Sequence, residues 1–155
     1  MNAATAKPRS LIPIMVADIY ELAGRLRERG ETIARTVGQT QARWQVMSAA
    51  SVEPHTVPQI ARVLGVTRQN VQRIADALVA DGSAAYQDNP DHRTSPYLVL
   101  TGRGRAALDR LSKAASGHHA RLARKLAPSD IVALQRGLRR LLEALTEIDP
   151  VPSQT

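Results

Sequence analysis

Cysteine and phenylalanine are both absent from this sequence of 155 residues, and aromatic residues make up only 3% of it. Without cysteine the chain has no disulfide, no thiolate metal site and no thiol-based redox switch. No apolar run approaches the roughly 18 residues that are needed to span a membrane. The start of the chain also lacks the apolar stretch of a signal peptide. We therefore expect a soluble, cytoplasmic protein with no membrane partner.

Signatures of catalysis and of metal binding are missing as well. None of the four histidines has the spacing of metal ligands, and the adjacent His118 and His119 point to different faces of a helix, which makes them poor co-ligands. The sequence contains no glycine-rich phosphate loop and no Gly-x-Ser-x-Gly nucleophile motif. We expect no metal site and no cofactor, and we expect that the chain is not an enzyme.

Positive charge exceeds negative charge by seven, from 21 Lys and Arg against 14 Asp and Glu. A basic chain favours polyanionic partners, of which nucleic acid is the commonest. The excess is spread along the chain rather than gathered in one patch, so it indicates such a partner only weakly. Apolar residues make up 43% of the sequence, and with few aromatics the core must consist of Leu, Ile, Val and Ala, which suits packed helices.

Apolar residues at three- and four-residue steps predict long amphipathic helices towards both ends of the chain. The first helix is expected to end near Gly30, and a second begins after a Thr40 cap. A long helix follows Thr101 and extends to Leu126, and the last helix begins at Ser129. One subunit of this length would struggle to bury all the apolar stripes of the terminal helices, so we expect a homodimer.

A helix-turn-helix lies between these terminal helices. Thr56-Val57-Pro58-Gln59 is a capping box that begins a short helix, and Gly65 ends this helix. Thr67 then caps a second amphipathic helix, which extends from Arg68 to Asp81 and is followed by Gly82.

Two short strands are expected after this motif, at residues 83–87 and 97–100. The loop between them, residues 88–96, is rich in turn formers and is typical of a wing. The predicted fold is mainly α with a small β wing of two or three strands. We assign residues 38–101 to a winged helix-turn-helix lobe, residues 11–37 and 102–149 to a helical dimerisation region, and residues 1–10 to a disordered N-terminus.

The second helix of the motif has a polar face that suits DNA. Opposite its apolar stripe lie amides and arginines, which pair with adenine and guanine in the major groove, and its N-terminus attracts phosphate. On the wing loop, Arg93 is placed to enter a minor groove. The expected DNA-binding residues are Thr67, Arg68, Gln69, Asn70, Gln72, Arg73 and Arg93.

Asp76 is unexpected on this face because a carboxylate repels phosphate. Two pairings are open: with Arg73 one turn away on the helix, or with Arg93 across the junction of helix and wing. The pair with Arg93 would aim the wing and could couple the position of the wing to DNA affinity.

Four segments together resemble the MarR family of winged helix-turn-helix transcriptional regulators. Gln41-Ala42-Arg43-Trp44-Gln45-Val46-Met47 is similar to the Gln-x-x-Trp-x-Val-Leu helix of that family, and residues 57–73 resemble its helix-turn-helix. Asp91-His92-Arg93 matches its Asp-x-Arg wing signature, and Leu100-Thr101-Gly102-Arg103-Gly104 resembles the Leu-Thr-x-x-Gly start of its next helix. The resemblance covers residues 11–148, although Ser83-Ala84-Ala85-Tyr86 departs from the usual hydrophobic pair followed by Arg.

The resemblance implies a homodimer that binds double-stranded DNA at a palindromic operator and represses transcription. It also implies that a small aromatic or acidic ligand releases the DNA, from a pocket between the dimerisation region and the DNA-reading lobe; Tyr20 and Trp44 are the candidate residues there. Asp91, which lies in the wing signature, and Asp76 are the residues expected to orient the wing.

Two other functions fit the same fold. A winged helix also serves as a protein-interaction module, which would show no steep loss of DNA affinity with salt, unlike a DNA reader that releases counterions. A DNA-binding protein without any ligand is the other alternative. A pocket near Trp44, or ligand-induced release of DNA, would separate a sensor from such a protein.

Overall fold

The computed structural model describes residues 8–148. The chain divides into two compact units, one ending at Ala115 and the other beginning at Ser116. The first unit contains α1 (Pro8–Arg35), α2 (Gln41–Val52), β1 (His55–Thr56), α3 (Val57–Leu64), α4 (Arg68–Ala80), β2 (Ala84–Gln87), β3 (Tyr97–Leu100) and the first part of α5 (Gly102–Ala123). The second unit contains the end of α5 and α6 (Pro128–Ile148). None of the helices in residues 8–148 is long and apolar enough to cross a membrane.

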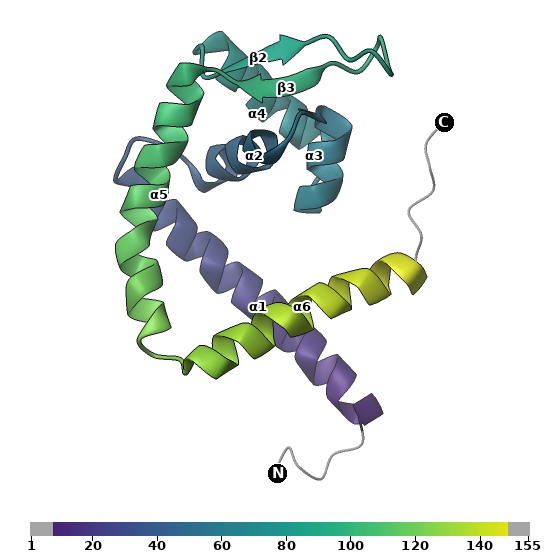
Figure 1. The fold of residues 1–155 in the computed structure, drawn as a ribbon, viewed down its shortest axis with the longest axis vertical. Coiled ribbons are helices and arrows are strands. Elements are labelled where there is room, and N and C mark those ends of the chain that lie inside the picture. Colours follow the sequence, from purple (N-terminus) through teal and green to yellow (C-terminus); the bar gives the residue numbers. More distant parts are fainter. Residues whose placement is uncertain (1–7, 149–155) are drawn as a thin grey trace. The chain divides into compact units, whose positions relative to one another are not determined.

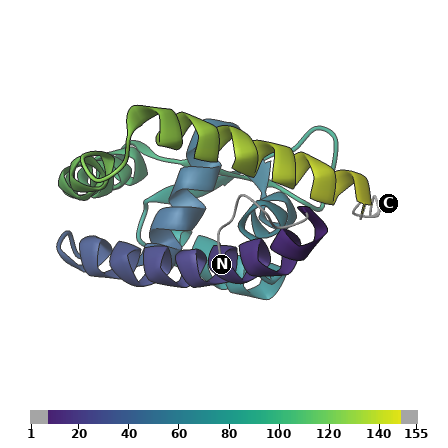
Figure 2. The same cartoon turned by 90° about the horizontal axis from the view of Figure 1, so that it is seen from below.

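α1 is a continuous rod (Figures 1 and 2) that extends beyond its predicted end. The prediction that it ends near Gly30 is wrong: the chain leaves the helix only after Arg35, and Gly38 has the positive φ of 70° that glycine tolerates. Gly30 instead lies where α2 comes close, since a Cβ atom there would be 2.8 Å from Cγ of Gln41. The segment predicted to be disordered is residues 1–10. Residues 1–7 of it lie outside the described residues, whereas residues 8–10 belong to α1 and are helical.

The start of α2 is joined to α1 by a carboxylate. Glu31 of α1 accepts a hydrogen bond of 2.8 Å from the backbone N–H of Gln41, while Thr40 accepts one of 3.2 Å from the N–H of Arg43. The Thr40 cap is thus confirmed, and two of the four free N–H groups of the helix end are satisfied. The hydrogen bond from Gln41, together with Arg35, lowers the pKa of Glu31.

The helix-turn-helix forms as its capping signals predict. Thr56 and Gln59 make the reciprocal hydrogen bonds of the capping box at the start of α3, and Gly65 ends the helix in the left-handed conformation at φ 63°. The core of the lobe lies between α2, α3, α4, β3 and α5, and its largest fully buried side chains include Met47, Ile60 and Leu78. Burying each such side chain contributes about 1.5–3 kcal/mol.

The sheet has three antiparallel strands in the order β1-β3-β2. β2 and β3 form a hairpin with Ala84 opposite Leu100 and Gln87 opposite Tyr97. The two residues of β1 pair with the start of β3. The loop between β2 and β3 projects beyond the strands as the predicted wing (Figure 1), which confirms a mainly α fold with a small β wing.

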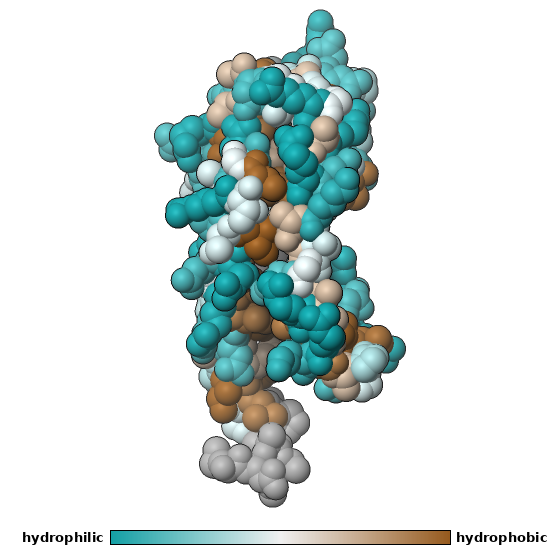
Figure 3. Space-filling view, turned by 90° about the vertical axis from the view of Figure 1, so that its left-hand side faces the viewer, coloured by the Kyte–Doolittle hydropathy of each residue, from teal (hydrophilic) through white to brown (hydrophobic). Residues whose placement is uncertain are grey.

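The last two helices differ from the prediction only at their ends. α5 ends at Ala123, three residues before Leu126, and α6 begins at Pro128 rather than at Ser129. Proline suits the first helical position because the N–H that it lacks has no partner there. Hydrophilic residues predominate on the face that α5 lines (Figure 3), in agreement with the exposed arginines at 103, 105 and 110.

Candidate nucleic-acid interface

α4 is held with one face in the core and the other face open. Thr67 caps it by accepting a hydrogen bond of 3.2 Å from the N–H of Asn70, and Val71, Ile74, Ala75 and Leu78 are buried. The opposite face lines an open hollow on the surface, formed by Arg68, Gln69, Gln72, Arg73 and Asp76. The structure therefore brings together on one exposed face five residues that the sequence predicted to lie there.

The cations of this face are not neutralised by the protein. Within residues 8–148, neither Arg68 nor Gln69 makes a side-chain hydrogen bond or an ion pair. Arg73 donates a long hydrogen bond of 3.4 Å from Nη2 to Oδ1 of Asn70. Since both arginines lack a carboxylate partner, their charge is available to a polyanion.

Asp76 has partners other than the arginines considered from the sequence. Its Oδ1 atom accepts hydrogen bonds from Nε2 of Gln72 at 2.8 Å and from the hydroxyl of Tyr86 at 2.7 Å. Among the described residues it forms no ion pair, so the pairing with Arg73 or Arg93 is wrong. Tyr86 comes close because it shares a face of β2 with the buried Ala84, the face that packs on α4.

Tyr86 completes a three-membered network, because Gln72 Nε2 also donates to its hydroxyl at 2.7 Å. Partial burial, followed by the hydrogen bond to the Asp76 carboxylate, raises the pKa of Tyr86 to about 12. The phenol therefore keeps its proton at neutral pH. The sequence signal that could have indicated this network is the departure at Ser83-Ala84-Ala85-Tyr86, where the family has a different pattern.

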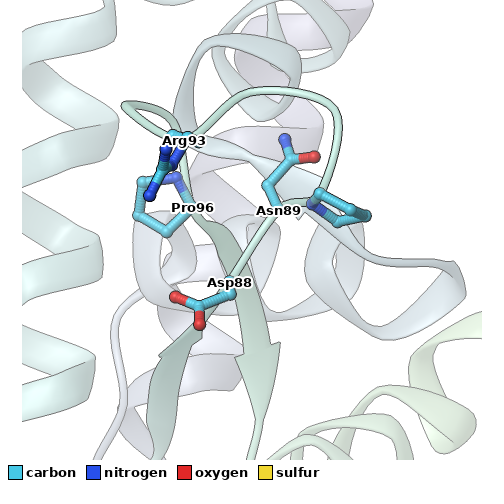
Figure 4. Close-up of a pocket in the computed structure, with 5 residues that line it drawn as sticks. Asp88, Asn89, Arg93 and Pro96 are labelled. Atoms are coloured by element: carbon cyan, nitrogen blue, oxygen red, sulfur yellow. The ribbon is translucent and has the colours of Figure 1, made fainter.

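The wing turn is organised by Asn89, whose side chain is buried. Its Nδ2 donates to the carbonyl of Ser95 at 3.0 Å, and its Oδ1 accepts from the N–H of Asp91 at 3.0 Å. Figure 4 shows Asp88 and Asn89 on one limb of the loop and Arg93 on the other. Sequence reasoning treated this asparagine only as a turn former and missed its role.

Arg93 lines a hollow of the wing with neighbouring residues of the loop (Figure 4). It is exposed and makes no hydrogen bond or ion pair within residues 8–148. The side chain of Asp91 is exposed as well, and only its backbone N–H takes part in the turn. A role of the Asp91 carboxylate in orienting the wing stays a prediction.

Behind the interface, Arg43 of α2 forms an ion pair with Asp81 at the end of α4. Asp81 also accepts a hydrogen bond of 3.0 Å from the backbone N–H of Ser83. Burial raises the pKa of Asp81, but hydrogen bonds from Ser83 and Arg43 outweigh this and the net pKa is lowered. This pair ties the end of α4 to α2 and so fixes the position of the exposed face.

The start of α5 is joined closely to the turn before β2. Thr101 donates from its hydroxyl to the carbonyl of Gly82 at 2.6 Å and caps α5 by accepting from the N–H of Gly104 at 3.2 Å. The helix approaches so closely that a Cβ atom on Gly104 would lie 1.9 Å from the carbonyl oxygen of Ser83. The Leu-Thr-x-x-Gly segment therefore positions α5 against the base of the wing.

The residues proposed for a ligand pocket are in different environments. Trp44 is partly buried and packs against the core of the lobe, whereas Tyr20 of α1 is 77% exposed. A pocket between them stays a prediction. The rings of His118 and His119 have centroids 6.2 Å apart, and residues 8–148 contain no group of three side chains that could hold a metal ion.

Comparison with known proteins identifies the family of this chain. The model of the MarR family matches residues 37–93, which include the helix-turn-helix and end at Arg93 of the wing. An uncharacterized protein of Mycobacterium tuberculosis is 51% identical over 131 residues, which cover 84% of this chain and 92% of the relative. The chain belongs to the MarR family.

Two further relatives of this MarR-family chain have names that describe regulators. The transcriptional activatory protein BadR of Rhodopseudomonas palustris is 30% identical over 108 residues, which cover 67% of this chain and 61% of BadR. The solved structure of the transcriptional repressor CouR bound to a 23-mer DNA duplex is 27% identical, with a TM-score of 0.71, and the match covers 88% of this chain and 98% of CouR. Family and fold are those of DNA-binding transcription regulators.

Proposed function

We propose that this chain binds a palindromic operator as a homodimer, with α4 in the major groove and the wing in a minor groove. The observation that carries the proposal is the exposed face of α4. It presents arginines and amides at the start of a helix, and Arg68 and Gln69 have no partner within residues 8–148. Arg93 on the wing, which also has no carboxylate partner among the described residues, supplies a further cation. The CouR structure, which contains a 23-mer DNA duplex, supports DNA as the partner of this chain.

The residues divide into those that position the protein and those that read bases. Thr67 and Arg68, at the N-terminus of α4, suit phosphate, because backbone N–H groups and positive charge meet there. Gln69 and Arg73 lie on the exposed face of the helix, where an amide pairs with adenine and a guanidinium with guanine. Arg93 contacts the narrow minor groove beside the site.

Solvent-exposed apolar residues on α6 and α1 support the homodimer. α6 has no buried residue, yet Leu134, Leu138, Leu142 and Leu145 are between 45% and 58% exposed. In α1, Leu22 is 50% exposed in the same way. A second copy of the chain would bury these stripes, as in an isologous dimer.

We further propose that the chain acts as a repressor that a small aromatic or acidic ligand releases from DNA. The description of CouR as a repressor supports the repressor role, whereas the description of BadR as an activatory protein favours the opposite sign of regulation. The ligand is proposed on the family resemblance alone. Occupation of an operator that overlaps a promoter would be sufficient for repression. A reporter gene driven by the selected operator tests the sign, because deletion of the regulator should raise expression.

DNA recognition is tested by selecting bound sequences from random DNA and then measuring affinity across a salt series. A DNA reader should select an inverted repeat and lose affinity steeply with salt. Replacing Arg68 by Ala should reduce the slope of log affinity against log salt by about 1. Arg110→Ala, an exposed arginine of α5, is the matched control and should leave the slope unchanged. A flat salt response with no selected sequence would favour a protein-interaction module instead.

The dimer is tested by sedimentation of Leu138→Glu. A charge in the buried centre of an apolar interface costs several kcal/mol, so the variant should sediment as a monomer and bind a half-site only weakly. Val52→Glu places the same charge on an 82% exposed residue at the end of α2 and is the control. A wild-type protein that sediments as a monomer at micromolar concentration would refute the proposed dimer.

A further inference from the structure

The amide of Gln72 is already occupied within the protein. Its Nε2 atom donates to Oδ1 of Asp76 at 2.8 Å and to the hydroxyl of Tyr86 at 2.7 Å. A glutamine amide has two N–H donors and one carbonyl oxygen. With one N–H directed at each of these two acceptors, both donors are used, and the carbonyl oxygen is the group of Gln72 that remains free.

The direction of each hydrogen bond in this network follows from which atoms of the three side chains can donate and which can accept. The carboxylate of Asp76 only accepts, so it must face the nitrogen of the Gln72 amide and not its oxygen. The Tyr86 hydroxyl donates its single proton to Asp76 at 2.7 Å, so towards Gln72 it can only accept. Because the pKa of Tyr86 is raised to about 12, the phenol holds that proton throughout the neutral range.

The three side chains thus expose acceptor oxygens and no N–H or O–H donor. The free groups are the carbonyl oxygen of Gln72 and the second carboxylate oxygen of Asp76, in a hollow whose other members include Arg68 and Arg73. In the major groove, cytosine N4 and adenine N6 are donors, whereas guanine O6 and thymine O4 are acceptors at the corresponding exocyclic positions. An acceptor surface attracts the first pair and repels the second.

We propose that Gln72, fixed by Asp76 and Tyr86, is a specificity-determining residue that accepts from an exocyclic amino group, so that it selects cytosine or adenine and excludes guanine and thymine. This inference rests on the proposed function, since it requires α4 in the major groove. It differs from the usual reading of a glutamine, which pairs with adenine through both its oxygen and its nitrogen.

Gln69 provides an internal comparison on the same helix. Its side chain makes no hydrogen bond within residues 8–148, so both its donor and its acceptor are free. Gln69 can therefore form the bidentate pair with adenine N6 and N7. Two glutamines three residues apart on α4 should then differ in their dependence on adenine N7.

The experiment begins with base preferences selected from random DNA by the wild type, Gln72→Ala and Gln69→Ala. The operator position whose preference is lost in Gln72→Ala is the position that Gln72 reads, and Gln69→Ala identifies the second position in the same way. At the Gln72 position, the wild type should accept cytosine and adenine within about threefold and disfavour guanine and thymine by about fivefold or more.

7-Deazaadenine, which lacks the N7 acceptor, then tests whether a glutamine of α4 donates a hydrogen bond to N7 of adenine. Placed at the Gln72 position, it should change wild-type affinity by less than about twofold, whereas at the Gln69 position it should cost about fivefold or more. The double variant Asp76→Ala/Tyr86→Phe frees the amide of Gln72. In this variant adenine should be preferred over cytosine by about fivefold, and 7-deazaadenine at the Gln72 position should become costly.

Each outcome decides between the alternatives. A wild-type loss of about fivefold with 7-deazaadenine at the Gln72 position would overturn the inference, because Gln72 would then be donating to N7. Base preferences in Gln72→Ala that match the wild type would also overturn it while leaving the proposed function intact. No selected sequence for the wild type would instead remove the proposed function itself. The unchanged cost at the Gln69 position checks that α4 of the double variant still reads DNA.

Discussion

Gly104 offers the strictest test of how the winged lobe is packed. A Cβ atom at this position would lie 1.9 Å from the carbonyl oxygen and 3.0 Å from the carbonyl carbon of Ser83. Ordinary contact begins at 3.4 Å, so the overlap is about 1.5 Å. The obstructing atoms are backbone, which cannot rotate away as a side chain can. Gly104→Ala therefore has to displace the start of α5 from the turn before β2.

The size of the effect follows from what this displacement disrupts. Overpacking costs about 1–3 kcal/mol, and the hydrogen bonds that Thr101 makes to the backbone of Gly82 and Ser83 weaken with it, at about 1 kcal/mol each. We expect Gly104→Ala to lower the free energy of unfolding by about 3–5 kcal/mol, a large part of the stability of a domain of this size.

Urea unfolding followed by circular dichroism measures this change. Protein concentration must be held equal, because the stability of a dimer depends on it. Gly102→Ala is the matched control: it lies in the same turn of α5 and has no atom within 4 Å of its Cβ position, so stability should change by less than about 1 kcal/mol. If the two variants unfolded at the same urea concentration, the close approach of α5 to Ser83 would be refuted.

Two further predictions concern acid stability and the wing. Folding lowers the pKa values of Glu31 and Asp81, so the two carboxylates stabilise the folded state fully above pH of about 4.5, the unfolded value of Glu31, and this contribution is lost as pH falls through the folded values. Asp81→Asn should therefore flatten the acid side of a plot of melting temperature against pH. An unchanged slope would contradict this prediction. Asn89→Ala removes two hydrogen bonds from the wing turn, so the Asp91 amide should exchange faster with solvent and DNA affinity should fall. Arg93→Ala should then cost less affinity in the Asn89→Ala background than in the wild type, and equal costs would separate the turn from DNA binding.

The order of the elements in the lobe could be predicted because its signals are local. Thr56, Gly65 and Thr67 each act on backbone groups within a few residues, and each ends or begins a helix where expected. β1 could not be found in this way, because two residues are too few to show a period of two. The prediction at Gly30 is wrong because its cause is not local. Local rules assign this glycine to a helix end, whereas in the structure it allows α2 to approach α1 closely.

The polar contacts of the site were harder to predict than its location. The sequence places Gln72 and Asp76 on the outer face of a helix, as found, but their shared partner Tyr86 comes from the strand after the turn. Charge alone favoured an arginine as the partner of Asp76. Packing decided otherwise, because β2 runs along α4 and brings a phenol within hydrogen-bond distance.

The carboxylate of Glu31 at the start of α2 has a mechanical consequence. If the C-terminal end of α1 turned or slid on its own by more than about an ångström, the N–H of Gln41 would lose the carboxylate that accepts its hydrogen bond. The end of α1 and the whole of α2 should therefore move together as one rigid body. A movement that begins in α1 would then reach Arg43, and through its ion pair with Asp81 it would reach the end of α4, the helix that we propose to bind DNA.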